Sequence, residues 1–324
     1  MRVLLTIPSF WPNNYDLNHA DSTDTHDETS AGATQQSSEQ IEERRQQLSL
    51  NIARLHQLFG RDHWTLDLSN GNATPDIERQ FWQLDIIIVT PPNNPVVQGL
   101  YVPMDLYRLH VTEDSEPEQL ATQCHSQLAS NVSQRYDIYG YLEEDLMLSD
   151  ALFFDKLKWF SQTTLAKGIE NAVLVANRVE LSAEGPVSKL YIDGHTGLSL
   201  ADYYQDLNNP PPLTLNVLGR NFQFERAQNP YSGCFFLTTA QMAHWAKQPW
   251  FADGDIAYRD AKISGASLGL MKTFALYRPG VSNASFLEVQ RTSTPFIDQI
   301  VEALQQSLTL NAQSHDPNHS LMQV

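Results

Sequence analysis

The stretch YDIYGYLEEDLML (residues 136–148) carries a run of apolar and aromatic residues straight into three adjacent carboxylates, Glu143, Glu144 and Asp145. The chain then turns apolar again at once, with Leu-Met-Leu followed closely by two phenylalanines. Apolar segments on both sides of the acids indicate a triplet that is held in place between buried elements. The pattern predicts a central strand that ends in a functional acidic group.

A hard divalent cation is the ligand that this acidic group would suit. Ligands of open α/β sheets bind beyond the carboxyl ends of the strands, and Mg²⁺ and Mn²⁺ prefer oxygen ligands, often shared with substrate phosphates. Along a strand Glu143 and Asp145 point to one side and Glu144 to the other, so Glu143 and Asp145 are the predicted metal ligands. The alternative is that the strand ends at Leu142 and the acids face water, as charge runs usually do.

Short apolar runs and amphipathic stretches alternate through the first half of the chain. Strands are expected at residues 2–8, 64–68, 84–90, 106–111, 136–142 and 172–177, and helices at residues 48–59, 120–132 and 153–160. The run LDIIIVT (84–90) is unbroken and β-branched, which is typical of a strand buried on both faces. This alternation predicts an α/β fold, in which one large domain has a mostly parallel central sheet flanked by helices.

The second half of the chain is less regular. We expect a hairpin at residues 191–197, helices at 239–247 and 263–271, strands at 273–279 and 285–290, and a C-terminal helix at 297–308. Residues 18–40 are polar and almost without large apolar side chains, so they are predicted to be a disordered insertion. Residues 311–324 are predicted to be a flexible tail.

The composition narrows the classes of partner. The chain has 38 acidic and 21 basic residues and a formal net charge of -17, so its surface would repel nucleic acid and no nucleic-acid partner is expected. Cys124 and Cys234 lie among apolar neighbours and are expected to be buried thiols. No apolar run is long enough to cross a bilayer. A cytoplasmic location is therefore expected, with peripheral membrane contact left open.

The segment YDIYGYLEEDLMLSDALFFDKLKWF (136–160) resembles the metal and nucleotide-sugar region of GT-A fold glycosyltransferases, in which a YDxxxYxEDD strand precedes an apolar step and a helix. LLTIPSFW (4–11) resembles the first strand and nucleotide-contacting loop of that fold. NPYSGCFFLTTAQMAHW (229–245) resembles an acceptor-side segment, and ISGASLGLMKTFALYRPGVSNASFLEVQ (263–290) resembles the closing helix and strands. The likeness covers most of the chain outside residues 18–40.

The resemblance implies transfer of a sugar from a nucleotide-diphosphate donor to a glycan, lipid or small-molecule acceptor, with Mn²⁺ or Mg²⁺. It implies a nucleotide-sugar-binding half (1–17 and 41–178) and an acceptor-side half (179–310). Residues Pro8, Ser9 and Phe10 would contact the nucleotide, and Glu144 matches the middle acid of the motif. Arg291 stands where related sequences often have a metal-binding His, and it could pair with the diphosphate instead.

The catalytic base is a further departure from the family pattern, beside Arg291 and beside Glu144, where Asp is commoner in the family. Many relatives have an acid opening the helix near ISGAS, where this chain has Ile263 and Ser264. Asp255 and Asp253 lie just upstream and are the predicted bases, because a carboxylate can take the proton of an acceptor hydroxyl; the alternative is an Asp-Gly turn. Two rival functions stay open, a non-catalytic sugar or nucleotide binder and a metal-dependent phosphohydrolase.

Overall fold

The structure is a computed structural model, and it describes residues 1–10, 38–113, 117–193, 210–257 and 261–314. Its centre is a five-stranded sheet in the order β13-β6-β1-β4-β5. These strands are β1 (Arg2–Pro8), β4 (Gln83–Thr90), β5 (Arg108–Val111), β6 (Ile138–Leu142) and β13 (Cys234–Thr238). The strands β1, β4, β5 and β6 run parallel, and β13 lies antiparallel to β6. The predicted α/β class with a mostly parallel central sheet is confirmed.

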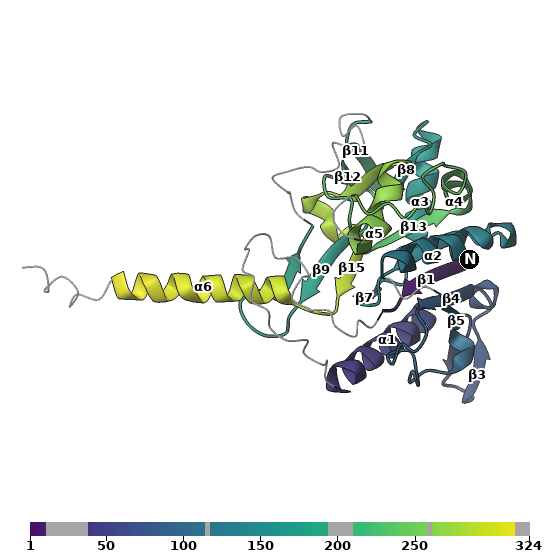
Figure 1. Ribbon diagram of the computed structural model, residues 1–324, viewed down its shortest axis with the longest axis horizontal. Coiled ribbons are helices and arrows are strands. Elements are labelled where there is room, and N and C mark those ends of the chain that lie inside the picture. The colour runs from purple at the N-terminus through teal and green to yellow at the C-terminus, as the bar shows by residue number, and fades with distance from the viewer. Residues whose placement is uncertain (11–37, 114–116, 194–209, 258–260, 315–324) are drawn as a thin grey trace, which may run out of the picture.

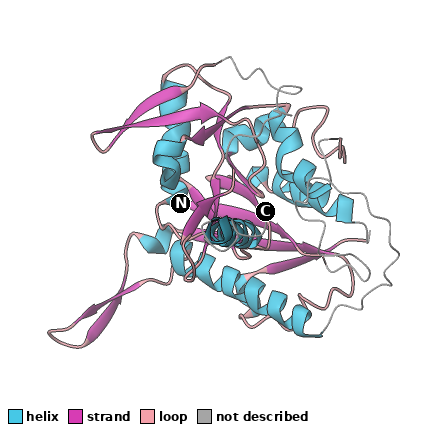
Figure 2. Ribbon diagram, turned by 90° about the vertical axis from the view of Figure 1, so that its left-hand side faces the viewer, coloured by secondary structure: helices cyan, strands magenta, loops and turns pink. Residues whose placement is uncertain are grey.

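Helices cover both faces of this sheet (Figure 2). One face carries α1 (Ser38–Phe59) and α3 (Phe153–Ala166), and the other carries α2 (Pro117–Ser130), α4 (Thr239–Trp245) and α5 (Ala261–Met271). Successive side chains of a strand point to opposite faces, so Leu5 packs with the first group of helices and Leu4 with the second. The two cores explain why the central strands are apolar without alternation.

Two further four-stranded sheets lie beside the central one, in the orders β10-β9-β15-β7 and β11-β12-β14-β8. Their strands are β7 (Leu146–Met147), β8 (Ala172–Leu174), β9 (Asn177–Leu181), β10 (Lys189–Tyr191), β11 (Leu213–Val217), β12 (Arg220–Arg226), β14 (Ala275–Pro279) and β15 (Glu288–Arg291). Short 3-10 helices lie at Arg79–Phe81, Met104–Leu106, Val132–Gln134 and Val281–Phe286. β7 follows the acidic triplet directly, so the triplet joins the central sheet to the second one.

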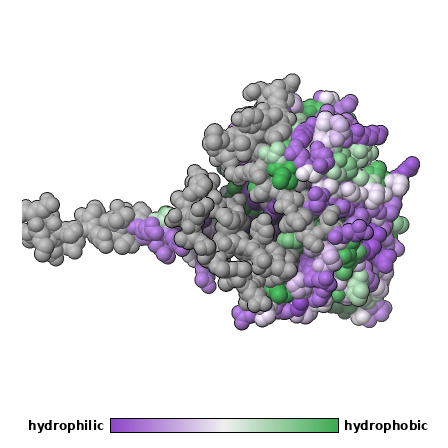
Figure 3. Space-filling model, in the orientation of Figure 1, coloured by the Kyte–Doolittle hydropathy of each residue, from purple (hydrophilic) through white to green (hydrophobic). Residues whose placement is uncertain are grey.

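The C-terminal helix α6 (Pro295–Ser314) extends away from the body of the molecule (Figure 1). On the face seen in Figure 3 the described surface is mostly hydrophilic, with scattered hydrophobic residues.

Within the described ranges, no helix has the length and apolar content that crossing a bilayer requires. Both cysteines are free and buried, as predicted.

Several predicted segments differ from the structure. The segment 64–68 does form a strand, β2 (Trp64–Asp67), but it pairs only with β3 (Asn72–Pro75) in an exposed hairpin outside the central sheet. Helix α1 begins at Ser38, inside the predicted insertion, and α6 continues to Ser314, inside the predicted tail. The rest of the insertion, the rest of the tail and the Gly194 side of the predicted hairpin turn lie outside the described residues.

The packing of α1 generates a first prediction. Leu55 is fully buried beneath the sheet, whereas Leu50 on the same helix is 59% exposed. Leu55→Ala should lower the free energy of unfolding by about 2–5 kcal/mol, because it leaves a cavity in the core. Leu50→Ala should change it by less than about 0.5 kcal/mol. Urea unfolding followed by circular dichroism measures both, and equal losses in the two variants would contradict the placement of α1.

Candidate functional site

The topological switch point of the central sheet lies between β1 and β6. From β1 the chain adds β4 and β5 on one side of the sheet and only then returns to add β6 on the other. Thr6 of β1 stands opposite Tyr141 of β6, so the two carboxyl ends lie side by side. Ligands of open α/β sheets bind outside the carboxyl ends of the strands at such a point. The residues after Pro8 and after Leu142 therefore frame the candidate site.

The loop after β1 is fastened to the end of β4. The backbone N–H of Ser9 donates to the carbonyl of Val89 at 2.9 Å, and the Asn94 amide donates to the Ser9 carbonyl at 3.1 Å and to its hydroxyl at 3.2 Å. Ser9 is fully buried, while Pro8 and Phe10 are partly exposed. Ser9 thus sets the course of the loop, and Phe10 is the side chain that it brings to the edge of the sheet.

The acidic triplet forms a tight turn, not the continuation of a strand. Strand β6 ends at Leu142, the N–H of Glu143 donates to the Gly233 carbonyl at 3.0 Å, and the N–H of Leu146 donates to the Glu143 carbonyl at 3.1 Å. Strand alternation was therefore the wrong reason for grouping Glu143 with Asp145. The alternative of solvated loop residues is also wrong for Glu143, which is only 3% exposed.

Glu143 and Asp145 nevertheless share a partner, Lys262 at the start of α5. The Lys262 ammonium lies 3.0 Å from Glu143 Oε2 and 3.6 Å from Asp145 Oδ2, and the lysine side chain is 50% exposed. Burial acts to lower the pKa of Lys262, but the two carboxylates outweigh it and hold that pKa well above its ordinary value. The lysine is therefore an ammonium ion across the neutral pH range.

The two carboxyl groups differ in protonation behaviour. Burial raises the pKa of Glu143, and Lys262 offsets only part of that effect. Burial also acts to raise the pKa of Asp145, but Lys262 and Arg291 outweigh it and hold the pKa below its ordinary value. Asp145 is thus the firmly ionised member of the pair.

Arg291 reaches Asp145 because of strand pairing. On β15 it stands opposite Leu146 of β7, the residue after Asp145, and its Nε lies 3.8 Å from Asp145 Oδ2. Its Nη1 lies 4.0 Å from Glu180 Oε1, and Glu180 in turn accepts hydrogen bonds from the N–H groups of Phe296 and Ile297 at the start of α6. A nearly buried guanidinium is therefore fixed beside the acidic turn.

Glu144 points away from this pair, toward α1. It forms an ion pair with Arg44, whose guanidinium also donates to the carbonyl of Phe10 at 2.8 Å. One arginine of α1 thereby ties the loop after β1 to the turn after β6. The structure brings together the predicted residues Ser9, Phe10 and Glu144 at the switch point, with Arg44 as the link between them.

A buried polar network lies behind the turn. The Tyr231 hydroxyl is 3.0 and 2.9 Å from the two carboxylate oxygens of Glu143, and the Arg178 guanidinium lies 4.4 Å from the centre of the Tyr231 ring. Arg178 and Arg278 both pair with Asp193, at 2.9 and 2.5 Å. Burial acts to raise the pKa of Asp193, but the two guanidiniums outweigh it and lower that pKa. The site therefore rests on a fully charged interior cluster.

Sequence reasoning singled out Arg291 but missed two other cations of this site, Arg44 and Lys262. Lys262 directly precedes the apolar helix segment ISGASLGLM, and nothing in its spacing links it to residues 143–145. Asp193 was placed only in a predicted hairpin turn, with no ion-pair role. A usable signal did exist for Arg278, because it lies inside the expected strand at residues 273–279 and a buried guanidinium requires a buried carboxylate.

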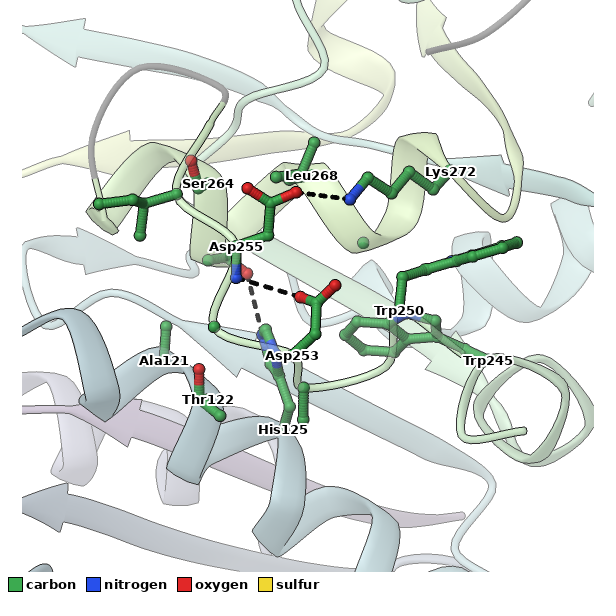
Figure 4. Close-up of a pocket in the computed structure, with 15 residues that line it drawn as sticks. Ala121, Thr122, His125, Trp245, Trp250, Asp253, Asp255, Ser264, Leu268 and Lys272 are labelled. Carbon is green, nitrogen blue, oxygen red and sulfur yellow. Dashed lines mark hydrogen bonds and ion pairs between the residues drawn. The ribbon is translucent and has the colours of Figure 1, made fainter. Parts of the chain in front are cut away.

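The predicted bases Asp253 and Asp255 line a pocket with residues of α5, from Ser264 at its first turns to Lys272 just past its end (Figure 4). Asp255 forms an ion pair at 2.7 Å with Lys272. Lys272 also lowers the pKa of Asp255, which weakens it as a base. Trp245 and Trp250 line the same pocket as the two aspartates.

The described residues do not fit a divalent cation at the predicted ligands. Among the ranges that the structure describes, no group of three or more His, Cys, Asp or Glu side chains could hold a metal ion. The space that Glu143 and Asp145 share already contains the Lys262 ammonium, and Arg291 is fixed beside Asp145. A divalent ion placed there would meet repulsion from both cations, which offsets the attraction of the two carboxylates.

Comparisons with known proteins assign no family. No protein-family model matches the chain, and no curated protein matches it. Among solved structures, the chain is similar to a CMP:2-keto-3-deoxy-manno-octonic acid synthetase complexed with CTP, with 12% sequence identity and a TM-score of 0.33. The similarity covers 95% of this chain and 99% of that chain. At this identity and TM-score it carries no argument about activity.

The interior cluster generates a second prediction. Asp193→Asn should lower the free energy of unfolding by about 3–5 kcal/mol, because it leaves two buried guanidiniums without their counter-ion. The matched control is Asp62→Asn, since Asp62 and its partner Arg61 are 88% and 73% exposed. The control should leave stability nearly unchanged. Urea unfolding of both variants is the measurement, and a loss at position 193 as small as the control's would contradict the buried pairing.

The backbone of the acidic turn generates a third prediction. Gly233 has φ of +63°, and a Cβ there would lie 2.7 Å from Leu146 Cδ1 and 2.9 Å from Glu143 Oε2. Gly233→Ala therefore combines left-handed strain, on the order of 1 kcal/mol, with a collision at the carboxylate. Gly219→Ala is the control, because φ is +80° and a Cβ would meet nothing within 4 Å. Thermal unfolding should show a larger loss at 233; equal losses would mean that Gly233 is not packed against Glu143.

Proposed function

We propose that this protein transfers a sugar from a nucleotide-diphosphate sugar to an acceptor hydroxyl. The observation that carries the proposal is the meeting of the loop after β1 with the acidic turn after β6 at the switch point of a parallel sheet. Arg44 bonds to both segments. A nucleotide bound at the loop after β1 would therefore lie next to a diphosphate bound at the acidic turn, with Arg44 between the two.

Each segment supports one part of the donor. The partly exposed Phe10 offers an aromatic ring for a nucleotide base, while Ser9 holds the backbone of that loop. Arg44, Lys262 and Arg291 supply positive charge around the acidic turn. Such charge would stabilise the diphosphate as it departs, because fixed cations act where negative charge develops in the transition state. Breaking the bond between the sugar and the diphosphate is the step that this arrangement favours.

The acceptor side is less defined. A glycan, a lipid and a small molecule all stay predictions, as do the roles of Asp253 and Asp255 in taking the acceptor proton. The pairing of Asp255 with Lys272 lowers the pKa of Asp255 and weakens it as a base, which favours the rival function of a non-catalytic nucleotide-sugar binder. The described residues do not favour a two-metal phosphohydrolase, which would need acids converging from several strands.

Thermal unfolding in the presence of donors tests the proposal. UDP-glucose, UDP-N-acetylglucosamine and GDP-mannose are each added to the full chain, in MnCl2 and separately in EDTA, with glucose 1-phosphate as a control ester. At least one nucleotide sugar should raise the unfolding temperature, because a ligand that binds only the folded state stabilises it. Release of UDP or GDP in the presence of sugar acceptors then reports turnover.

The outcomes separate the three functions. Stabilisation with turnover supports the proposal, stabilisation without turnover supports the binder, and stabilisation by glucose 1-phosphate alone supports the hydrolase. A matched pair of variants locates the site. Arg44→Met should reduce the stabilisation by the nucleotide sugar, whereas Arg61→Met, in an exposed arginine just past the end of the same helix, should not.

A further inference from the structure

We propose that Lys262 takes the place of a divalent cation in this site and binds the diphosphate of the donor directly. The inference rests on the proposed function and deepens it, because it states how the negative charge of the donor is met. Lys262 would be a binding residue for the diphosphate, and Arg291 would be its fixed companion. Donor binding would then need no metal ion.

The position of the Lys262 ammonium is the first support. It lies between Glu143 and Asp145, at 3.0 and 3.6 Å, where a cation bridging the two carboxylates would have to be. An ammonium group has three N–H donors, and the two carboxylates use at most two of them. Because the side chain is 50% exposed, a further donor can face an anion that arrives from the solvent side.

The pairing of the acidic turn is the second support. Each of its three carboxylates already has a cation of its own, since Glu143 and Asp145 contact Lys262, Asp145 also contacts Arg291, and Glu144 contacts Arg44. A divalent cation is attracted by carboxylates whose charge is not compensated. Three carboxylates matched by three cations offer a divalent cation no such excess, and a diphosphate would be attracted once the exposed Lys262 turns from its carboxylates toward the phosphate.

The contacts that Glu143 and Asp145 keep when Lys262 turns away are the third support. If Lys262 turns toward a phosphate, Glu143 keeps its contacts with the Tyr231 hydroxyl at 3.0 and 2.9 Å, and Asp145 keeps Arg291. Neither carboxylate is left buried and alone, which is the situation that makes breaking a buried ion pair costly. Arg291 is 8% exposed and lies in β15 beside Asp145, so it is the cation that stays with that carboxylate when Lys262 turns.

Binding of UDP and GDP to the full chain, measured by isothermal titration calorimetry, tests the inference. The wild-type chain should bind one of them equally well in EDTA and in MnCl2. Lys262→Met should weaken that binding in EDTA by about tenfold or more, as expected for the loss of a hydrogen bond between charged groups. Lys262→Arg should recover most of the affinity, because it restores the positive charge. Lys272→Met, in another ion-paired lysine just past the end of α5, should bind like the wild type.

The results also separate this inference from the function on which it rests. Binding that requires MnCl2 and disappears in EDTA would leave the proposed function standing and overturn the role of Lys262. If the Lys262→Met variant binds in EDTA as tightly as the wild type, the role of Lys262 is overturned as well. If neither UDP, GDP nor any of the nucleotide sugars binds in either buffer, both proposals fail. If Lys262→Met does not fold, two measurements still test the role of Lys262. They are the binding of the wild type in EDTA against MnCl2 and the binding of the Lys262→Arg variant in the same two buffers.

Discussion

Charge compensation at the carboxyl edge of the central sheet is the constraint on which the surrounding architecture depends. Three consecutive carboxylates follow a buried strand, and a carboxylate that leaves water is tolerated only when a cation or hydrogen-bond donors replace the lost hydration. The cations come from α1, α5 and β15, as Arg44, Lys262 and Arg291. These elements are far apart in the chain, and each must lie where its cation can pair with a carboxylate of the turn. The same ion pairs that hold the turn therefore hold a helix from each face and the second sheet against it.

The constraint continues inward through shared partners. Tyr231 contacts the carboxylate of Glu143 with its hydroxyl and the guanidinium of Arg178 with its ring, and Arg178 and Arg278 meet at Asp193. Polar groups in a low-dielectric interior stabilise one another strongly when all are paired. Asp193 follows β10, Arg178 lies in β9 and Arg278 in β14, so this cluster joins the second sheet to the third. The surface of the site is thus backed by a rigid interior, which is what preorganised charge requires.

Local patterns predicted the elements well and their partners poorly. The β-branched run 84–90 and the helix face of Leu48, Ile52, Leu55 and Phe59 correspond to β4 and α1, because burial leaves a period in the sequence. WTLDL predicted a strand correctly but could not reveal that β2 pairs only within an exposed hairpin. Ion pairs between positions more than one hundred residues apart, such as that between Glu143 and Lys262, leave no period at all. The grouping of Glu143 with Asp145 was right although the turn, not strand alternation, produces it.

The two departures from the glycosyltransferase pattern acquire a common meaning in three dimensions. In the sequence, Arg291 in place of His and the absence of an acid around Ile263 are separate and unrelated losses. In the structure, Arg291 and Lys262, the residue just before Ile263, converge on the same carboxylate, Asp145. Under the proposed function, these two basic residues together supply positive charge beside Asp145, where the family pattern has a metal ion. The two departures would then be one change in how the site meets the diphosphate of the donor.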